Sequence, residues 1–186
     1  MKNLKLTTVE TVDHIVKPDD FEAITLDSPA TKIFTDFKEY APLVIDENIK
    51  AVDTLQMMMK DHVHLKIVVS EKGDFLGIVT SIDVSERHII QATMKGLTRD
   101  EVLVSDLMVA RSDLKAFDIA ELERASVNDV VHALKQNGLR HCLVMDVANH
   151  HIRGIISSSD IARKLRIPLE VSNSITFAKI FEALHP

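Results

Sequence analysis

The sequence contains an internal repeat, and this repeat limits the fold more than any other feature. Residues 77–84 read Gly-Ile-Val-Thr-Ser-Ile-Asp-Val, and residues 154–161, at an offset of 77, read Gly-Ile-Ile-Ser-Ser-Ser-Asp-Ile. The apolar segments before them, 63–70 and 139–146, match at an offset of 76. Ordered matches of this kind are typical of duplicated units, so we expect two copies of one structural unit in the chain.

The segments before these strands predict a helix in each copy. In the first copy, Ile49 and Val52 begin a series of apolar residues with the spacing of one helix face. We pair them with Val127 and Val130 of the second copy, at an offset of 78. This pairing predicts two additional residues in the first copy around positions 57–62.

Each copy is predicted to have the element order β-α-β-β-α. Short runs rich in Val and Ile predict buried strands, and Ser126 three residues before Asp129 predicts a helix capping box. In the first copy we expect a strand at 42–45, a helix at 48–61, strands at 65–70 and 75–79, and a helix at 81–95. In the second copy we expect a strand at 116–119, a helix at 128–137, strands at 142–146 and 152–156, and a helix at 159–166.

One unit of about 60 residues buries too little surface to be stable alone. We therefore expect an α/β (α+β) fold in which the two units pack sheet to sheet with pseudo-twofold symmetry, with binding clefts between the sheets. The predicted division is an N-terminal extension at 1–30, a first repeat at 31–96, a second repeat at 97–168 and a C-terminal helix at 169–186. The apolar face of that last helix, expected from Asn173 to Leu184, needs a surface on the same chain or on a second copy.

Composition excludes several other classes of protein. With 46% hydrophobic and 27% charged residues the chain reads as globular, and it has no apolar run of the roughly 18 residues that a membrane helix needs. The first residues do not resemble a secretory signal, and a single cysteine suits a reducing compartment, so a cytoplasmic protein is expected. The net charge of −6 disfavours binding to nucleic acid. The five glycines form none of the known phosphate-binding loops.

The repeated motif Gly-h-h-[Ser/Thr]-x-x-Asp, where h is an apolar residue, occurs at 77–83 and 154–160. Each occurrence follows a helix, a strand and a turn, and in this arrangement residues 31–166 resemble a pair of cystathionine-β-synthase (CBS) domains, together called a Bateman module. The usual Leu-Pro-Val of the second strand is replaced by Lys66-Ile67-Val68 and by Cys142-Leu143-Val144. The resemblance implies a ligand such as AMP, ADP, ATP or S-adenosylmethionine, and it implies no catalytic cofactor.

The resemblance also implies a role for each motif residue. The carboxylates of Asp83 and Asp160 would accept hydrogen bonds from ribose hydroxyls, and Thr80 and Ser157 would contact ribose or phosphate. A carboxylate suits a vicinal diol because it accepts two bonds, and the N-terminus of the helix that follows attracts phosphate. The predicted nucleotide-binding residues are Thr80, Asp83, Arg87, His141, Ser157, Ser158, Asp160, Arg163 and Lys164.

Some of these residues have a second interpretation that needs no ligand. Thr80 with Asp83, and Ser157 with Asp160, have the spacing of a capping box, which stabilises a helix by about 1 kcal/mol. His141 either lines the base cleft or is packed in a strand. Arg87, Arg163 and Lys164 are candidates to neutralise a phosphate because each lies within the helix after its motif.

Other residues carry weaker signals. His62 and His64, and the pair at 150–151, suggest a metal site, but no further ligand with suitable spacing accompanies them, so we expect none. The three methionines at 57–59 are expected in the core or at a dimer contact, and Cys142 is expected to be buried and inert. We find no combination of nucleophile, base and orienting group, so we do not expect an enzyme.

These observations favour a stand-alone regulatory module that senses an adenosine nucleotide by a change of conformation. The resemblance implies a homodimer, since modules of this family commonly associate through their helices. The alternative is a structural or protein-interaction module with empty clefts, in which the C-terminal helix recruits an unidentified partner protein.

Overall fold

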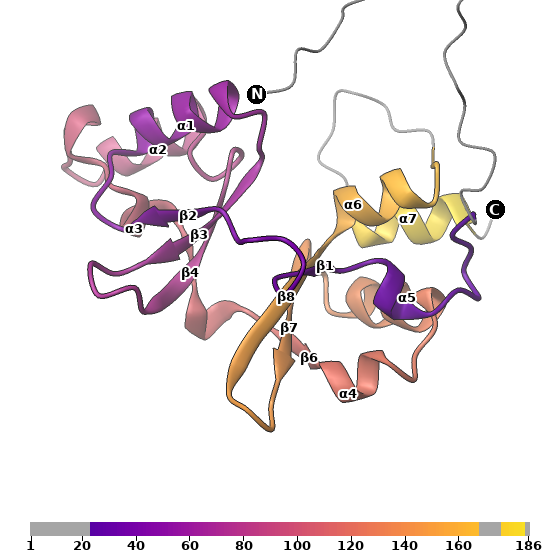
Figure 1. Ribbon diagram of the computed structural model, residues 1–186. Helices are drawn as coiled ribbons and strands as arrows, with labels where there is room; N and C mark the ends of the chain where they lie inside the picture. Colours follow the sequence, from indigo (N-terminus) through magenta and orange to yellow (C-terminus); the bar gives the residue numbers. More distant parts are fainter. Residues whose placement is uncertain (1–22, 168–175, 185–186) are drawn as a thin grey trace, which may run out of the picture.

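A computed structural model describes residues 23–167 and 176–184 (Figure 1). The described elements of the first part of the chain are η1 (Ala30–Lys32), β1 (Thr35–Asp36), β2 (Val44–Asp46), α1 (Ala51–Lys60), β3 (Leu65–Val69), β4 (Phe75–Thr80), α2 (Glu86–Thr93), η2 (Arg99–Glu101), α3 (Val104–Leu107) and β5 (Val109–Ala110). They are followed by η3 (Arg111–Asp113), β6 (Ala116–Asp118), α4 (Ile119–Leu122), α5 (Val127–Gln136), β7 (His141–Asp146), β8 (His151–Ser157), α6 (Ser158–Lys164) and α7 (Phe177–Leu184).

The strands form two sheets of four, one in each half of the molecule. The first has the order β2-β3-β4-β5 and the second the order β1-β8-β7-β6. In both sheets the leading strand of the repeat pairs in parallel with the next one, β2 with β3 and β6 with β7, and the other pairs are antiparallel. The predicted order β-α-β-β-α and the mixed α/β fold class are therefore confirmed.

The helices that follow the leading strands show that one part of the sequence pairing was wrong. Helices α1 and α5 are both ten residues long and begin at Ala51 and Val127, an offset of 76 that equals the offset of β3 and β7. The offset of 78 and the two additional residues near 57–62 are therefore incorrect. Pairing by apolar spacing matched Ile49 with Val127, whereas the equivalent of Val127 is Ala51; both of these residues are fully buried at the first position of a helix.

The fourth strand of each sheet comes from the segment that precedes the other repeat. Strand β1 pairs with β8 of the second repeat (Figure 1). Strand β5 pairs with β4 of the first. In this exchange of strands, the segments that lead into β1 and β5 also bond to the other repeat. The N–H of Ala51 donates to the Val102 carbonyl, and that of Val127 donates to the Ser28 carbonyl, both at 2.9 Å. Each half is thus completed by the segment that leads into the other repeat.

The strand exchange explains why a glycine stands at the first position of each repeated motif. Gly77 lies opposite Ala110 of β5, and Gly154 lies opposite Asp36 of β1. A Cβ atom at Gly77 would be 2.2 Å from the carbonyl oxygen of Val109, and one at Gly154 would be 2.2 Å from that of Thr35. A side chain cannot be accommodated at these distances, so glycine is required for the fourth strand to pair.

The buried apolar side chains of the described residues form three clusters. One lies in each half, beneath its own helices. The third joins the two sheets and is made of Ile67 and Ile78 from the first repeat with Leu143 and Ile155 from the second. The prediction that the two repeats pack sheet to sheet around a shared core is confirmed.

The helix after the first motif begins later than predicted. Helix α2 starts at Glu86 and not at 81, because residues 81–84 form a separate turn and Ser85 is extended, with φ −66° and ψ 156°. His88 Nδ1 lies 2.7 Å from the Ile82 carbonyl oxygen, within hydrogen-bonding distance across this break. In the second copy α6 starts at Ser158, directly after β8.

Helix α7 packs on α5 and α6 of the second half (Figure 1). Phe177 and Ile180 are buried there, and the Lys135 ammonium lies 3.6 Å from the centre of the Phe181 ring. The C-terminal helix predicted from the sequence therefore exists from Phe177, and its apolar face is covered by its own chain; residues 173–175 lie outside the described residues. Of the N-terminal extension, 1–22 lie outside them as well, and Ile24 packs against the core of the second half.

Candidate functional site

The motif of the first repeat folds into a closed ring at the end of β4. One carboxylate oxygen of Asp83, Oδ2, accepts hydrogen bonds from the Thr80 N–H at 2.8 Å and from the Thr80 hydroxyl at 2.6 Å. The Asp83 N–H in turn donates to Thr80 Oγ1 at 3.3 Å. Within the part of the chain that the structure describes, no protein group donates to the second oxygen of Asp83.

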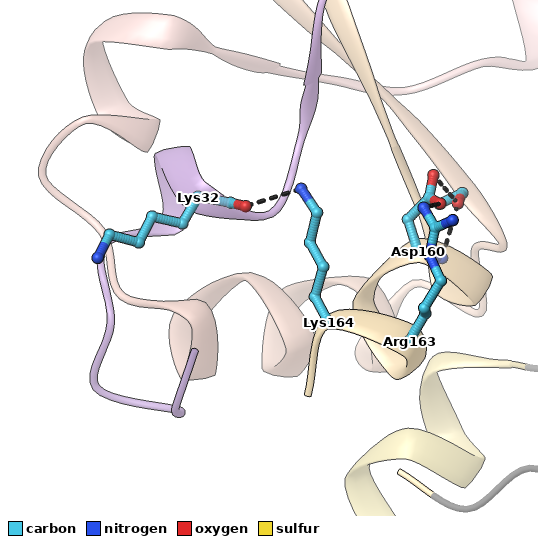
Figure 2. A network of polar contacts seen from close by, with 5 residues as sticks. Lys32, Asp160, Arg163 and Lys164 are labelled. Atoms are coloured by element: carbon cyan, nitrogen blue, oxygen red, sulfur yellow. Dashed lines mark hydrogen bonds and ion pairs between the residues drawn. The ribbon is translucent and has the colours of Figure 1, made fainter. Parts of the chain in front are cut away.

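The motif of the second repeat closes a ring through the corresponding hydroxyl and carboxylate, and a cation contacts that carboxylate as well. The Ser157 hydroxyl donates to Asp160 Oδ2 at 2.7 Å, and the Asp160 N–H donates to Ser157 Oγ at 3.1 Å. The Arg163 guanidinium donates to the other oxygen, Oδ1, at 2.7 Å (Figure 2). The bond from the Asp160 N–H to Ser157 Oγ caps α6, as the ligand-free interpretation predicts. The bond to Arg163 gives Asp160 a competing partner that Asp83 lacks.

Lys164 is placed apart from this ring. Its ammonium donates to the carbonyl oxygen of Lys32 at 2.8 Å and so joins α6 to the exchanged segment (Figure 2). Burial lowers the pKa of Lys164, while the charge of Asp160 raises it and that of Arg163 lowers it. Of the two cations predicted to face a phosphate in this repeat, Arg163 lies on the carboxylate and Lys164 holds the segment that precedes β1.

Arg87, the corresponding cation of the first repeat, is exposed in the first turn of α2. Its guanidinium makes no hydrogen bond or ion pair with any of the described residues. The exposed apolar residues Ile90 and Met94 follow it at positions three and seven residues further on, so the three share one face of the helix.

His141 lies beside the motif of the second repeat. It is the first residue of β7 and is directly opposite Ser157 of β8. Burial lowers the pKa of its imidazole, the carboxylates of Asp83 and Asp160 raise it, and Arg140 lowers it. Ser158, the first residue of α6, is buried, and its N–H donates to the Arg140 carbonyl at 3.1 Å. The structure thus brings His141 under the influence of both carboxylates.

A pocket of about 310 Å³ opens beside Asp83. It lies between α2 and α3 of the first half. Of the predicted site residues, Asp83 lines this pocket. It is lined by Asp83, His88, Gln91, Ala92, Lys95, Leu97, Asp106 and Leu107. Sequence reasoning missed His88, Gln91 and Lys95, although their spacing along a predicted helix places them on one face.

The residues with weaker signals have structural roles. In the described ranges, 23–167 and 176–184, no three His, Cys, Asp or Glu side chains form a group that could hold a metal ion. His62 and His150 are exposed residues of tight turns with φ of 54° and 56°. Burial raises the pKa of the Cys142 thiol to about 12, as suits an inert cysteine. In the same ranges no helix has both the length and the apolar character to cross a membrane.

The fold and the two motifs define a duplicated α/β module with a hydroxyl–carboxylate pair at the end of one strand in each copy. The family model of the CBS domain matches residues 30–89 and 101–167, which is more than half of the chain. The chain therefore belongs to the CBS domain family and carries a tandem pair of these domains. Among curated proteins, no sequence match was found.

Solved structures share this fold. An uncharacterized conserved protein from Pyrococcus horikoshii is similar with a TM-score of 0.56 and 19% identity, over 80% of this chain and 100% of that one. A conserved CBS domain protein of unknown function from Thermoplasma acidophilum has a TM-score of 0.51 and 21% identity, over 81% of this chain and 76% of that one. The protein CBSX2, solved in complex with AMP, has a TM-score of 0.51 and 17% identity, over 73% of this chain and 94% of that one.

Proposed function

We propose that this protein is a regulatory module that binds an adenosine nucleotide beside Asp83 and Asp160, and that it is not an enzyme. The observation that carries the proposal is the equivalent position of the two carboxylates, each held by the hydroxyl of the residue three before it at the end of a strand. Membership of the CBS family supports it, as does the similar fold of CBSX2, which was solved with AMP.

The first repeat has the stronger chemical case. Asp83 keeps one carboxylate oxygen without a donor among the described residues, whereas Arg163 occupies the corresponding oxygen of Asp160. The pocket beside Asp83, at about 310 Å³, is at the lower end of the range that small-molecule sites occupy. Lys95 and His88 on its wall are groups that suit a phosphate. In the second repeat a ligand must first displace the guanidinium of Arg163 or recruit it.

The shared core and the exchanged strands support a role in regulation. A ligand that moves the end of β4 acts on β5, whose chain continues into the second repeat, and one that moves β8 acts on β1. Regulation further requires that the ligand bind one arrangement of the two halves more tightly than another. Such a difference would change their relative position when the nucleotide binds.

Calorimetry with AMP, ADP, ATP and S-adenosylmethionine tests the proposal. We expect binding of at least one of them, and we expect Asp83→Asn to remove binding at the first site. A matched control is Asp129→Asn, since Asp129 forms the same capping bonds with Ser126, at 2.8 and 2.7 Å, at the start of α5. The control should lose about 1 kcal/mol of stability and no affinity. Absence of heat and of a thermal shift with all four compounds would contradict the proposal.

A second candidate function is a ligand-free interaction module. Its support is that both motifs make the bonds of a helix cap or a closed turn, and that Asp160 has partners on both oxygens. It predicts that Asp83→Asn and Asp160→Asn behave as Asp129→Asn does. Recruitment of a partner by α7 would require this helix to leave α5, because Phe177 and Ile180 are buried there.

We also propose a homodimer in the cytoplasm, with repeats divided at 31–96 and 97–168. Exposed apolar side chains on α1 and α2 and just after them offer a surface for a second copy: Met57, Met59, Ile90 and Met94. A mass of one chain by light scattering at micromolar concentration would contradict the dimer.

A further inference from the structure

The turn that carries Asp83 is held on both sides. On one side Asp83 bonds to Thr80, the last residue of β4. On the other side the Ile82 carbonyl oxygen lies 2.7 Å from the His88 ring nitrogen Nδ1 and accepts the Ser85 N–H at 3.1 Å. The Ser85 hydroxyl, which makes no capping bond to α2, lies 3.1 Å from the same ring nitrogen. The imidazole therefore closes the break between this turn and α2.

The contact with Ile82 assigns the proton of the ring. A carbonyl oxygen only accepts hydrogen bonds, so Nδ1 of His88 must carry the hydrogen, and Nε2 is an acceptor in the neutral ring and a donor in the charged one. His88 also lines the pocket beside Asp83. Because Nδ1 is engaged by the turn, Nε2 is the ring nitrogen that remains for a ligand in this pocket. The two nitrogens of His88 thus have separable roles.

The second repeat lacks this arrangement. At the motif offset of 77, Leu165 stands where the first repeat has His88, and Ala162 stands in the place of the serine. Neither of these side chains donates or accepts a hydrogen bond. Helix α6 begins at Ser158, directly after β8, and no extended residue interrupts it. The break, and the histidine that closes it, are therefore features that the first repeat has and the second does not.

The charged neighbours of the two motif carboxylates differ as well. At the same offset, the equivalent of Arg163 is Glu86. Arg163 donates to Asp160. Glu86 instead accepts a hydrogen bond from Arg99 Nη1 at 2.6 Å. Among the described residues, Asp83 thus lacks the cation that a ligand at Asp160 would have to displace or recruit.

We propose that His88 is a positioning residue for the nucleotide site of the first repeat: through Nδ1 it fixes the turn that presents Asp83 to the pocket. This inference rests on the proposed function and assigns ligand binding to the repeat that has the break before its helix. A turn that is fixed before the ligand arrives needs no ordering when the ligand binds, so the cost of ordering does not reduce the affinity. The bond from Nδ1 is a single neutral hydrogen bond, and we expect its loss to weaken binding by up to about tenfold.

Two substitutions separate the roles of the ring nitrogens. The amide nitrogen of asparagine can replace Nδ1, and that of glutamine can replace Nε2, because each is the same number of bonds from Cα as the nitrogen it replaces. We expect His88→Asn to keep the bond to Ile82 and His88→Gln to lose it. His151→Gln, on an exposed residue at the start of β8, is the control and should change neither the turn nor the affinity.

Hydrogen exchange of the Ser85 amide, followed by NMR in the ligand-free protein, tests the role of Nδ1 without any nucleotide. The Ser85 N–H shares the Ile82 carbonyl with the ring, so its protection reports whether the turn is closed. We expect exchange at the wild-type rate in His88→Asn and up to about tenfold faster exchange in His88→Gln. Equal rates in the two variants would overturn the role of Nδ1 in the turn.

Calorimetry tests the effect on the site. The ligand is whichever of AMP, ADP, ATP and S-adenosylmethionine binds the wild type most tightly, and every protein also carries Asp160→Asn, so that only the first site is measured. We expect His88→Asn to bind up to about tenfold more tightly than His88→Gln. Equal affinities of these two variants, or no binding by Asp160→Asn alone, would overturn the proposal. If none of the four compounds binds the wild type, the proposed function and the role of His88 in binding fail together, whereas the exchange rates still decide whether His88 holds the turn.

Discussion

Replacement of Gly154 by alanine is the most direct test of the strand exchange. The added Cβ would lie 2.2 Å from the Thr35 carbonyl oxygen and 2.7 Å from a ring carbon of Phe34, whereas real Cβ atoms stay at least 3.0 Å from such neighbours. Strand β1 must therefore shift by the better part of an ångström. The shift strains its two pairings with β8 and the ion pair of Asp36 with Arg153, in which Nε donates to Oδ1 at 2.7 Å.

The expected loss of stability follows from how β1 responds. If the strand moves and stays paired, overpacking costs about 1–3 kcal/mol. If it detaches, Phe34, which is 8% exposed, also loses its burial, at a cost of roughly 2 kcal/mol more. Gly77→Ala should behave similarly, since its Cβ would lie 2.2 Å from the Val109 carbonyl oxygen.

Equilibrium unfolding in urea measures the loss, provided that the slope of the transition is unchanged. Gly73→Ala is the control, because Gly73 has a φ of +83° and an added methyl group would meet no atom within 4 Å among the described residues. Only the left-handed backbone then costs energy, about 1 kcal/mol. A Gly154→Ala protein no less stable than Gly73→Ala would refute the argument that the glycine exists to admit β1.

Three further predictions concern other parts of the fold. The hydrogen bond from Arg153 lowers the pKa of Asp36. The pair therefore stabilises the fold at pH values above the ordinary pKa of a carboxyl group, and this stabilisation is lost as the pH falls through the lowered pKa. The stability of Asp36→Asn should accordingly depend less steeply on pH in the acid range. Cys142, with a pKa of about 12, should react with a thiol reagent at pH 8 only after unfolding, and fast reaction of the folded protein would disprove its burial. Phe177→Ala should release α7 at a cost of about 3–5 kcal/mol, seen as proteolysis of the C-terminus, while Glu182→Ala on the exposed side of the same helix should not.

The local chemistry of the site was predictable from spacing. A hydroxyl three residues before a carboxylate can close a ring with it, and the pairs Thr80–Asp83 and Ser157–Asp160 do so. The groups that the basic side chains of α6 contact were not predictable from the sequence. Lys164 turns to a carbonyl 132 positions earlier in the chain, at Lys32, because the exchanged segment brings that carbonyl within its reach.

The placement of Arg87 and His141 depended on features outside their own segments. Arg87 is exposed in the first turn of α2, which begins only at Glu86 because the extended Ser85 interrupts the helix predicted from 81. His141 reads in the sequence as the start of a buried strand. Only the packing of one sheet on the other brings Asp83, a residue of the other repeat, to act on it.

The sequence by itself determined the two repeats, their central strands and helices, and the identity of the motif residues, because these depend on apolar periodicity and on contacts within a few residues. The tertiary structure alone decided how the two halves complete each other. Strands β1 and β5 are only two residues long, and they have no alternation of apolar residues from which they could be predicted. They are strands only because a glycine in the opposite repeat leaves space for their backbone and a sheet edge supplies their hydrogen bonds. The free energy of this strand pairing arises from contacts between segments far apart in the chain, so the local sequence does not reveal it.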